Sequence, residues 1–386
     1  MGDVVKRATV LGGRLVLLDE VIDDGVLEIV GGRFGYVGPT SGWSGAAPTQ
    51  VGTIAPGFID IHCHGGGGSS VTAGVRADID EVARHHLRHG TTTMLASLVT
   101  AEPDDITAGV AAIAEVAASG SSIIGSHLEG PFLGHGHCGA HEPSLLRAPD
   151  RQLVQGWLSA GRGTVRMVTI APELDGADAV SRLIAEHGAL VAIGHTDADV
   201  ATFGRALATS SVSLVTHLFN GMAPMHHRAP GPVAASLAAL ARGGTHVELI
   251  ADGIHLTDET VALVFDLDTH NRVVLVSDAM TAAGMPDGTY RLGPLEVRVT
   301  DGVARTITEP ASIAGSTARL ADVVRRCILH AGIDPARAIR AASATPARLL
   351  RLADRGRLAT GLRADLVTLD DSWTVTGVLR GGERVR

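Results

Sequence analysis

Eight short runs of apolar and β-branched residues recur along the middle of the chain, and each run ends at a polar residue. In order, they read TIAPGFIDIHCH, TTTMLASLVT, SIIGSHLEG, VRMVTIAPE, LVAIGHT, VSLVTHLFN, HVELIADGIH and RVVLVSDAM. Seven steps lead from His62 in the first run to Asp278 in the last, each about 31 residues long, which is the length of one strand-helix-strand unit. The segments between the runs have helical patterns, with Gly90 and Gly188 suited to helix ends.

Strands that alternate with helices predict a parallel sheet covered by helices. Eight units of this length close into a (β/α)₈ barrel, also called a TIM barrel, whereas an open doubly wound sheet is the competing architecture. We favour the barrel because polar residues end nearly every run, and a barrel gathers the carboxyl ends of its strands around one mouth. An open sheet would spread them along an edge.

The two ends of the chain have a different pattern, of short strands joined by turns. Residues 1–56 and 350–386 predict a small β-sandwich domain built from both termini, outside a barrel formed by residues 57–349. Two Asp-Gly pairs, at 287–288 and 301–302, are hairpin signals. They predict a β-rich excursion after the eighth strand.

Charge and cysteine content restrict the partners and the compartment. A formal net charge of −9 gives the chain no general attraction to nucleic acid or to an anionic membrane, so neither is an expected partner. There is no run of about 18 uninterrupted apolar residues and no pattern of a secretory signal. Cys63, Cys138 and Cys327 are too few and too scattered for a disulfide framework. We expect a cytoplasmic globular protein.

Histidines and carboxylates stand at the predicted carboxyl ends of five strands. His62 and His64 lie two residues apart on an extended segment, so their side chains leave the same face. Strands three, five, six and eight end in Glu129, His195, His217 and Asp278. Imidazole and carboxylate ligands without thiolates suit catalytic Zn²⁺ or a similar ion. Six such groups exceed the needs of one ion, so we predict two adjacent divalent ions that share Glu129. The alternative is that individual histidines are hydrogen-bonded core residues.

The motifs around these residues resemble the amidohydrolase superfamily and, within it, the N-acetylglucosamine-6-phosphate deacetylase family. They are PGFIDIHCHG, GSHLEGPFL, GAHEP, IGHTDA, THLFNGMAPMHHRAPG, ADGIHL, LVSDAM and IAGS, and the resemblance covers essentially the whole chain. Several superfamily members bridge two ions with a carboxylated lysine, but Lys6 is the only lysine here, which leaves Glu129 as the bridge. Some family members carry Gln-x-Asn at the first ligand pair and are associated with one ion. His62 and His64 favour two.

The resemblance implies a metal-dependent hydrolase that converts N-acetylglucosamine 6-phosphate and water into glucosamine 6-phosphate and acetate. It also implies a homodimer. We expect zinc, although the donor set also suits Fe, Mn, Co or Cd. Asp278 would take the proton of the attacking water and return it to the departing nitrogen. In the GAH motif, Ala140 and His141 are implied to contact the substrate, with His141 at the N-acetyl carbonyl.

The same resemblance assigns the remaining contacts with the sugar and its phosphate. These are Asn220, Gly221, Arg228, His255 and the backbone stretch Ile313, Ala314 and Gly315. Arginine suits phosphate because its planar guanidinium can donate two parallel hydrogen bonds. In the glycine-rich loop 133–140, we hypothesise that the thiol of Cys138 approaches the ligand or makes the enzyme sensitive to oxidants. For His127, support of the ligands and plain packing both stay open.

Two other functions remain compatible with this pattern. Another cyclic-amide or amidine amidohydrolase would share the metal ligands, but it would not need Arg228 and His255 to hold a phosphate. A catalytically inactive scaffold protein of the same shape would be expected to lose ligands. All six candidate ligands are present, which favours an enzyme.

Overall fold

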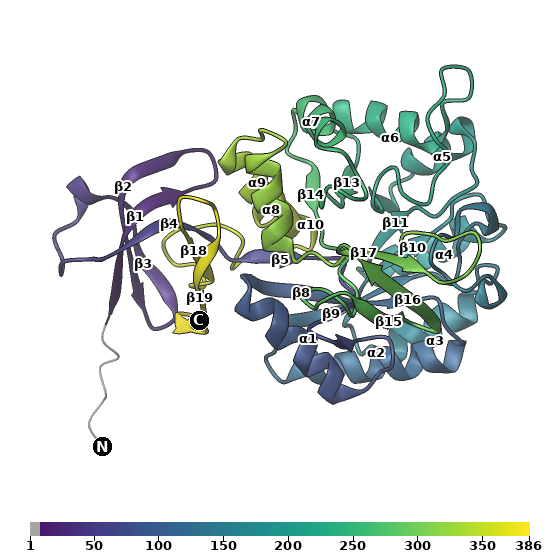
Figure 1. Cartoon of the computed structure of the whole chain (residues 1–386), viewed down its shortest axis with the longest axis horizontal. Helices are drawn as coiled ribbons and strands as arrows, with labels where there is room; N and C mark the ends of the chain where they lie inside the picture. Colours follow the sequence, from purple (N-terminus) through teal and green to yellow (C-terminus); the bar gives the residue numbers. More distant parts are fainter. Residues whose placement is uncertain (1–7) are drawn as a thin grey trace.

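The computed structural model describes residues 8–386 and contains a central sheet of eight parallel strands (Figure 1). The strands are β5 (Phe58–Asp60), β8 (Thr91–Val99), β9 (Ile123–Glu129), β10 (Val165–Ile170), β11 (Leu190–Ile193), β12 (Val212–Val215), β13 (His246–Leu249) and β14 (Val273–Leu275). They neighbour one another in the order in which they follow along the chain. Each lies within one of the eight apolar runs, so the predicted strands are confirmed.

The first and last strands of this sheet are joined through the residues that follow them. The backbone N–H of Asp278 donates to the carbonyl oxygen of His62 (2.9 Å), and that of His64 donates to Ala279 (2.8 Å). Cys63 and Ala279 form a parallel bridge. The sheet is therefore a (β/α)₈ barrel, as predicted, and the open sheet is excluded.

Helices surround the barrel on its outer face (Figure 1). They are α1 (Arg76–Arg88), α2 (Pro103–Ala118), α3 (Arg151–Ala160), α4 (Ala177–Glu186), α5 (Val200–Leu207), α6 (Gly231–Ala241), α7 (Asp258–Leu267), α8 (Leu320–Leu329), α9 (Pro335–Ala341) and α10 (Ala344–Leu349). Asp150, Asp199 and Thr257 cap three of them by accepting hydrogen bonds from backbone N–H groups of the first turn. Across residues 8–386, no helix combines the length and the apolar character needed to cross a bilayer.

Apolar side chains fill the barrel interior and close one of its ends. Ile59, Leu95 and Leu214 belong to this cluster, and Leu350, which follows α10, packs against them. The carbonyl oxygen of Leu350 accepts a hydrogen bond from Arg166 near the start of β10 (2.7 Å). The segment after α10 therefore plugs the amino-terminal end of the barrel, and the carboxyl-terminal end remains as the mouth.

Strands from both ends of the chain form one further sheet beside the barrel (Figure 1). Its order is β20 (Glu383–Arg384), β19 (Val375–Arg380), β18 (Leu366–Leu369), β4 (Thr49–Pro56), β1 (Thr9–Val16), β2 (Val21–Val30) and β3 (Arg33–Pro39). Arg380 ties the sheet to the barrel by donating to the carbonyl oxygens of Thr92 (3.1 Å) and Gly120 (2.8 Å). The domain boundaries at residues 56 and 350 stay a prediction, and Lys6 lies outside the described residues.

A three-stranded sheet follows the eighth barrel strand, as predicted, and consists of β15 (Gly288–Leu292), β16 (Leu295–Thr300) and β17 (Val303–Thr306). The second Asp-Gly pair forms the turn between β16 and β17. The first pair does not form a hairpin turn, and that prediction is wrong. Asp287 instead accepts hydrogen bonds from the backbone of Asp301 (2.7 Å) and Gly302 (3.0 Å), so its carboxylate stabilises the other turn.

Two short strands, β6 (Gly65–Gly66) and β7 (Ser69–Ser70), complete the strands near the mouth. The three-stranded sheet packs against the same region, since Leu292 and Val297 share a buried cluster with Val99 and Ala140. The barrel mouth is therefore partly covered by the excursion that follows β14.

Replacing Leu214 by Ala tests the barrel interior. Leu214 is fully buried, so the substitution leaves a cavity and should lower the free energy of unfolding by about 2–5 kcal/mol. Leu329→Ala is the matched control, because Leu329 is 44% exposed, and it should change the stability by less than about 0.5 kcal/mol. Urea denaturation followed by tryptophan fluorescence measures both, and equal midpoints for the two variants would contradict the assignment.

Candidate active site

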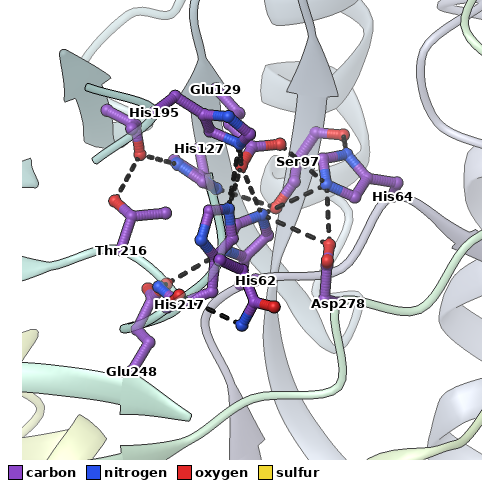
Figure 2. Close-up of polar contacts among 12 residues, drawn as sticks. His62, His64, Ser97, His127, Glu129, His195, Thr216, His217, Glu248 and Asp278 are labelled. Atoms are coloured by element: carbon purple, nitrogen blue, oxygen red, sulfur yellow. Dashed lines mark hydrogen bonds and ion pairs between the residues drawn. The ribbon is translucent and has the colours of Figure 1, made fainter. Parts of the chain in front are cut away.

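The six candidate ligands from the sequence lie together at the mouth of the barrel (Figure 2). All are buried, with at most 8% of any residue exposed. Glu129 is at the centre: its Oε1 lies 2.8 Å from His217 Nε2 and 3.2 Å from His195 Nε2, and its Oε2 lies 3.2 Å from His64 Nε2. Asp278 Oδ1 lies 3.1 Å from His64 Nε2. Residues up to 216 positions apart thus form one compact group.

Three of these residues have an unusual backbone conformation. His195, His217 and Asp278 have positive φ angles of 44°, 22° and 47°. Residues other than glycine rarely adopt this region, and each such residue costs about 1–3 kcal/mol. Backbone strain of this kind is concentrated at functional sites, where the surrounding structure maintains it.

Hydrogen bonds to the ring nitrogens define how two of the histidines face Glu129. Nδ1 of His64 donates to the carbonyl oxygen of Ser97 (2.9 Å), and Nδ1 of His195 donates to that of His137 (2.9 Å). Because a carbonyl oxygen can only accept, Nδ1 carries the hydrogen, and a neutral ring points its Nε2 lone pair at the carboxylate. Lone pairs facing a carboxylate repel unless a cation or a proton lies between them. This geometry suits a bound metal ion.

The electrostatics of the group also favour added positive charge. Burial opposes a charge on His62, but the carboxylates of Glu129, Glu248 and Asp278 outweigh it and raise the pKa of His62 well above its usual value. Burial likewise opposes a charge on His64, yet hydrogen bonds to Asp278 and Glu129 raise the pKa of His64 to about 9. A divalent cation would supply the same positive charge without protons on the ring nitrogens.

Two sets of three ligands share one residue. His62, His64 and Glu129 form one set, and Glu129, His195 and His217 form the other, with the donor atoms of each set within 4.8 Å of one another. Nitrogen and carboxylate donors without thiolates fit a catalytic zinc ion or a similar divalent ion. The residues present therefore fit the predicted metal centre.

Asp278 is ionised in this environment. Burial opposes its charge, but the neighbouring His62 and His64 lower the pKa of Asp278 to about 2. An ionised carboxylate at the mouth of the barrel can accept a proton from a water molecule.

His141 lies beside the ligands and presents a hydrogen-bond donor. The backbone N–H of Thr100 donates to Nδ1 of His141 (3.3 Å), so the hydrogen of the neutral ring is on Nε2. That nitrogen lies 3.4 Å from Oε2 of Glu129. Burial lowers the pKa of His141 to about 4, although the charge of Glu129 opposes this. At neutral pH, His141 is therefore an uncharged N–H donor.

A cavity of about 250 Å³ is lined by five of the six candidate ligands, all except the fully buried His62. Most of the predicted substrate contacts line it, namely Ala140, His141, Asn220, Gly221, His255, Ile313 and Gly315. Ala314 does not line the cavity, because it is fully buried behind the wall and its N–H donates to Ala304 (3.0 Å).

Two predicted site residues lie away from this cavity. Arg228 is exposed on the loop before α6, and its guanidinium lies 2.7 Å from Nε2 of His227. Cys138 is half-buried next to the short 3₁₀ helix His135–His137 and does not line the cavity. Burial, helped by the charges of Asp197 and Glu142, raises the pKa of the Cys138 thiol, which disfavours the reactive thiolate. The roles of Arg228 and Cys138 stay predictions.

Sequence reasoning missed Glu248 as a site residue. Glu248 is fully buried in β13, and its Oε2 lies 3.0 Å from Nδ1 of His62 and accepts from the backbone N–H of His217 (3.1 Å). It therefore supports one ligand from each set, as carboxylates behind metal-binding histidines commonly do. The signal was present in the sequence, because a glutamate inside a buried strand is rare unless it has a partner.

His127 belongs to a polar network beside the candidate ligands. Its Nδ1 lies 3.0 Å from Oγ of Ser97, the residue whose carbonyl oxygen accepts from His64 (Figure 2). Its Nε2 lies 2.9 Å from Oγ1 of Thr169. Its ring also packs edge-on against His62, with centroids 4.5 Å apart. His127 therefore packs against one candidate ligand and contacts the residue that accepts from another, and its supporting role stays a prediction.

Comparisons with known proteins agree with this geometry. Residues 53–385 match the amidohydrolase family. The N-acetylglucosamine-6-phosphate deacetylase of Bos taurus is 36% identical over 343 residues, which are 86% of this chain and 83% of that protein. The N-acetylgalactosamine-6-phosphate deacetylase of Escherichia coli O157:H7 is 34% identical over 379 residues, which are 97% of this chain and 98% of that protein.

A solved structure is similar over almost the entire length. The N-acetyl-D-glucosamine-6-phosphate deacetylase of Mycobacterium smegmatis has 40% sequence identity and a TM-score of 0.92, and the match covers 98% of this chain and all of that chain. This chain therefore belongs to the amidohydrolase family, in the branch that contains these deacetylases.

Proposed function

We propose that the protein hydrolyses the N-acetyl group of N-acetylglucosamine 6-phosphate to give glucosamine 6-phosphate and acetate. The observation that carries this proposal is the shared carboxylate of Glu129 between two sets of candidate ligands, beside a cavity lined by most of the predicted substrate residues. The similarity to deacetylases of sugar phosphates supports the same reaction.

The metal centre of this proposal holds two divalent ions, for which we favour zinc. His62, His64 and Glu129 would hold one ion, and Glu129, His195 and His217 would hold the other. Bound ions of this kind polarise the amide carbonyl and lower the pKa of a water molecule from about 15.7 towards 7. Asp278, which is also a predicted ligand, would accept the proton of the attacking water and return it to the departing nitrogen.

The other residues of the cavity bind and orient the substrate. His141 donates its Nε2–H to the oxygen of the acetyl carbonyl, where negative charge develops during hydrolysis. Ala140, Asn220, Gly221, His255, Ile313 and Gly315 line the space around the sugar and its phosphate. The backbone and side-chain donors of these residues fix the orientation of the substrate.

We further propose a homodimer in the cytoplasm. Arg228 lies outside the cavity of its own chain, so its predicted phosphate contact requires a movement of its loop or the site of a second subunit. The three unpaired cysteines, Cys63, Cys138 and Cys327, fit a reducing compartment.

Acetate release from purified protein supplied with Zn²⁺ tests the reaction. We expect kcat/KM for N-acetylglucosamine 6-phosphate to exceed that for N-acetylglucosamine by about 100-fold or more, because each charge-assisted hydrogen bond to the phosphate contributes about 1.5–3 kcal/mol. A preference for N-acetylgalactosamine 6-phosphate would assign the reaction of the Escherichia coli relative instead. Absence of acetate release from all three sugars would favour the inactive scaffold protein.

Asp278→Asn tests the proton transfer. The amide is nearly the same size as the carboxylate but cannot accept the proton, so kcat should fall by about 10²–10⁴-fold while the far-UV spectrum and melting temperature change little. A kcat close to that of the wild type would exclude this role for Asp278.

Glu129→Gln tests the shared ligand. We expect about two metal ions per chain in the wild type and fewer than one in this variant, measured by elemental analysis after gel filtration, because a neutral amide cannot balance both ions. Glu115→Gln is the matched control, since Glu115 is exposed on α2, and its metal content should equal that of the wild type. Removal of metal by a chelator should also lower the melting temperature, because the ions bind the folded state. Unchanged metal content in Glu129→Gln would refute the bridging role.

A further inference from the structure

Asp252 is a buried carboxylate beside the cavity that the proposed reaction does not use. It lies three residues after β13, and its side chain is only 5% exposed. Oδ1 accepts from the backbone N–H groups of Ile254 (2.9 Å) and His255 (2.8 Å). Oδ2 lies 2.9 Å from Nδ1 of His255 and accepts from Oγ of Ser316 (2.8 Å). Four protein groups thus surround this carboxylate, and it does not line the cavity.

The contact with Asp252 determines what His255 presents to a ligand. A carboxylate at Nδ1 keeps the hydrogen on that nitrogen and fixes the orientation of the ring. His255 lines the cavity, and its side chain is only 6% exposed. Burial opposes a charge on His255, but the bond to Asp252 and the charges of Asp252 and Asp278 raise its pKa. The protonated ring then has a second N–H, at Nε2, which Asp252 does not occupy.

The charge of His255 matters because the cavity has few sources of positive charge. Among the described residues that line it, none is arginine or lysine. The other lining histidines are His141, which is uncharged, and the candidate metal ligands His64, His195 and His217. Within a single chain and outside the candidate metal ligands, His255 is therefore the lining side chain best suited to donate to an anionic substituent of the substrate, because the contact with Asp252 favours its protonated form.

Asp252 also connects His255 to the wall of the cavity. Ser316 directly follows the stretch from Ser312 to Gly315, which contributes three lining residues. The backbone N–H of Ser316 donates to the carbonyl oxygen of Asp278 (2.8 Å), and its carbonyl oxygen accepts from Met280 (2.9 Å). The Asp252 carboxylate thus links the loop that follows β13 to this wall, and the backbone of Ser316 links the wall to the segment that follows β14.

We propose that Asp252 is a positioning residue that makes His255 a cationic hydrogen-bond donor to the phosphate and thereby gives the site its selectivity for phosphorylated sugars. This inference rests on the proposed function. Asp252 takes no part in the hydrolysis itself, which uses Asp278. Its substitution therefore affects the binding of phosphate and leaves the chemical step intact.

Asp252→Asn separates these effects. For N-acetylglucosamine 6-phosphate, we expect KM to rise about 10-fold or more and kcat to change less than about 3-fold, because a charge-assisted hydrogen bond is replaced by a weaker neutral one. For N-acetylglucosamine, which has no phosphate, both constants should stay near their wild-type values. A purely structural role would instead lower kcat for both sugars together, and that result would overturn the proposal.

Ser316→Ala is the control for the wall. It removes one of the four contacts of Asp252 but keeps the contact with His255, so the ratio of the KM values for the two sugars should stay close to that of the wild type. If Ser316→Ala changes this ratio as much as Asp252→Asn, the wall determines selectivity and the proposal is wrong.

Two measurements do not depend on turnover. Calorimetry with inorganic phosphate and with glucosamine 6-phosphate should show binding weakened about 10-fold or more in Asp252→Asn, and unchanged affinity would contradict the proposal. Nitrogen NMR of the His255 ring should show that its pKa falls in this variant. The proposed function is tested separately, by acetate release from the wild type, so either idea can fail without the other.

Discussion

The buried carboxylate of Glu129 imposes the arrangement of the whole site. Five imidazole nitrogens lie between 2.8 and 3.4 Å from its oxygens, contributed by His62, His64, His141, His195 and His217. A carboxylate removed from water is costly unless positive charge or hydrogen bonds compensate it. Protons on the rings could do this, but as long as His64 and His195 are neutral, their Nδ1 hydrogen bonds leave Nε2 lone pairs facing the carboxylate. A bound metal cation would satisfy both the lone pairs and the carboxylate.

The barrel is the scaffold that makes this arrangement possible. Parallel strands direct their carboxyl ends to one mouth, so candidate ligands from five strands meet although they are far apart in sequence. The apolar side chains of the barrel interior, closed at the amino-terminal end by the segment after α10, pack beneath the mouth and hold these residues in place. Such support is needed because three candidate ligands have left-handed backbone conformations that cost free energy. The packed barrel therefore maintains the strained backbone conformations of the site.

Periodicity and strand ends sufficed to predict the eight strands and the residues that meet at the mouth. They did not reveal Glu248, because inside a strand its side chain looks like an isolated polar residue until the neighbouring strands bring His62 and His217 to it. The Asp287-Gly288 pair led to a wrong hairpin prediction for a similar reason. The carboxylate of Asp287 accepts a hydrogen bond from the backbone of Asp301, in a turn fourteen residues later. The exposure of Arg228 was equally invisible, because the course of a long loop depends on tertiary contacts. Local patterns predict elements, whereas these three features depend on pairs of distant residues.

Two aspartates near the mouth show how surroundings assign different tasks to the same side chain. Asp278 and Asp252 follow adjacent strands, and burial opposes the charge of both. Asp278 lies among the candidate metal ligands and lines the cavity, so it can exchange a proton with a ligand. The carboxylate of Asp252 is surrounded by donors from Ile254, His255 and Ser316, so it can act on a ligand only through the residues that it holds. The two carboxylates therefore differ in their access to the cavity rather than in their acidity. Asp278 can react with a substrate, whereas Asp252 can only position His255.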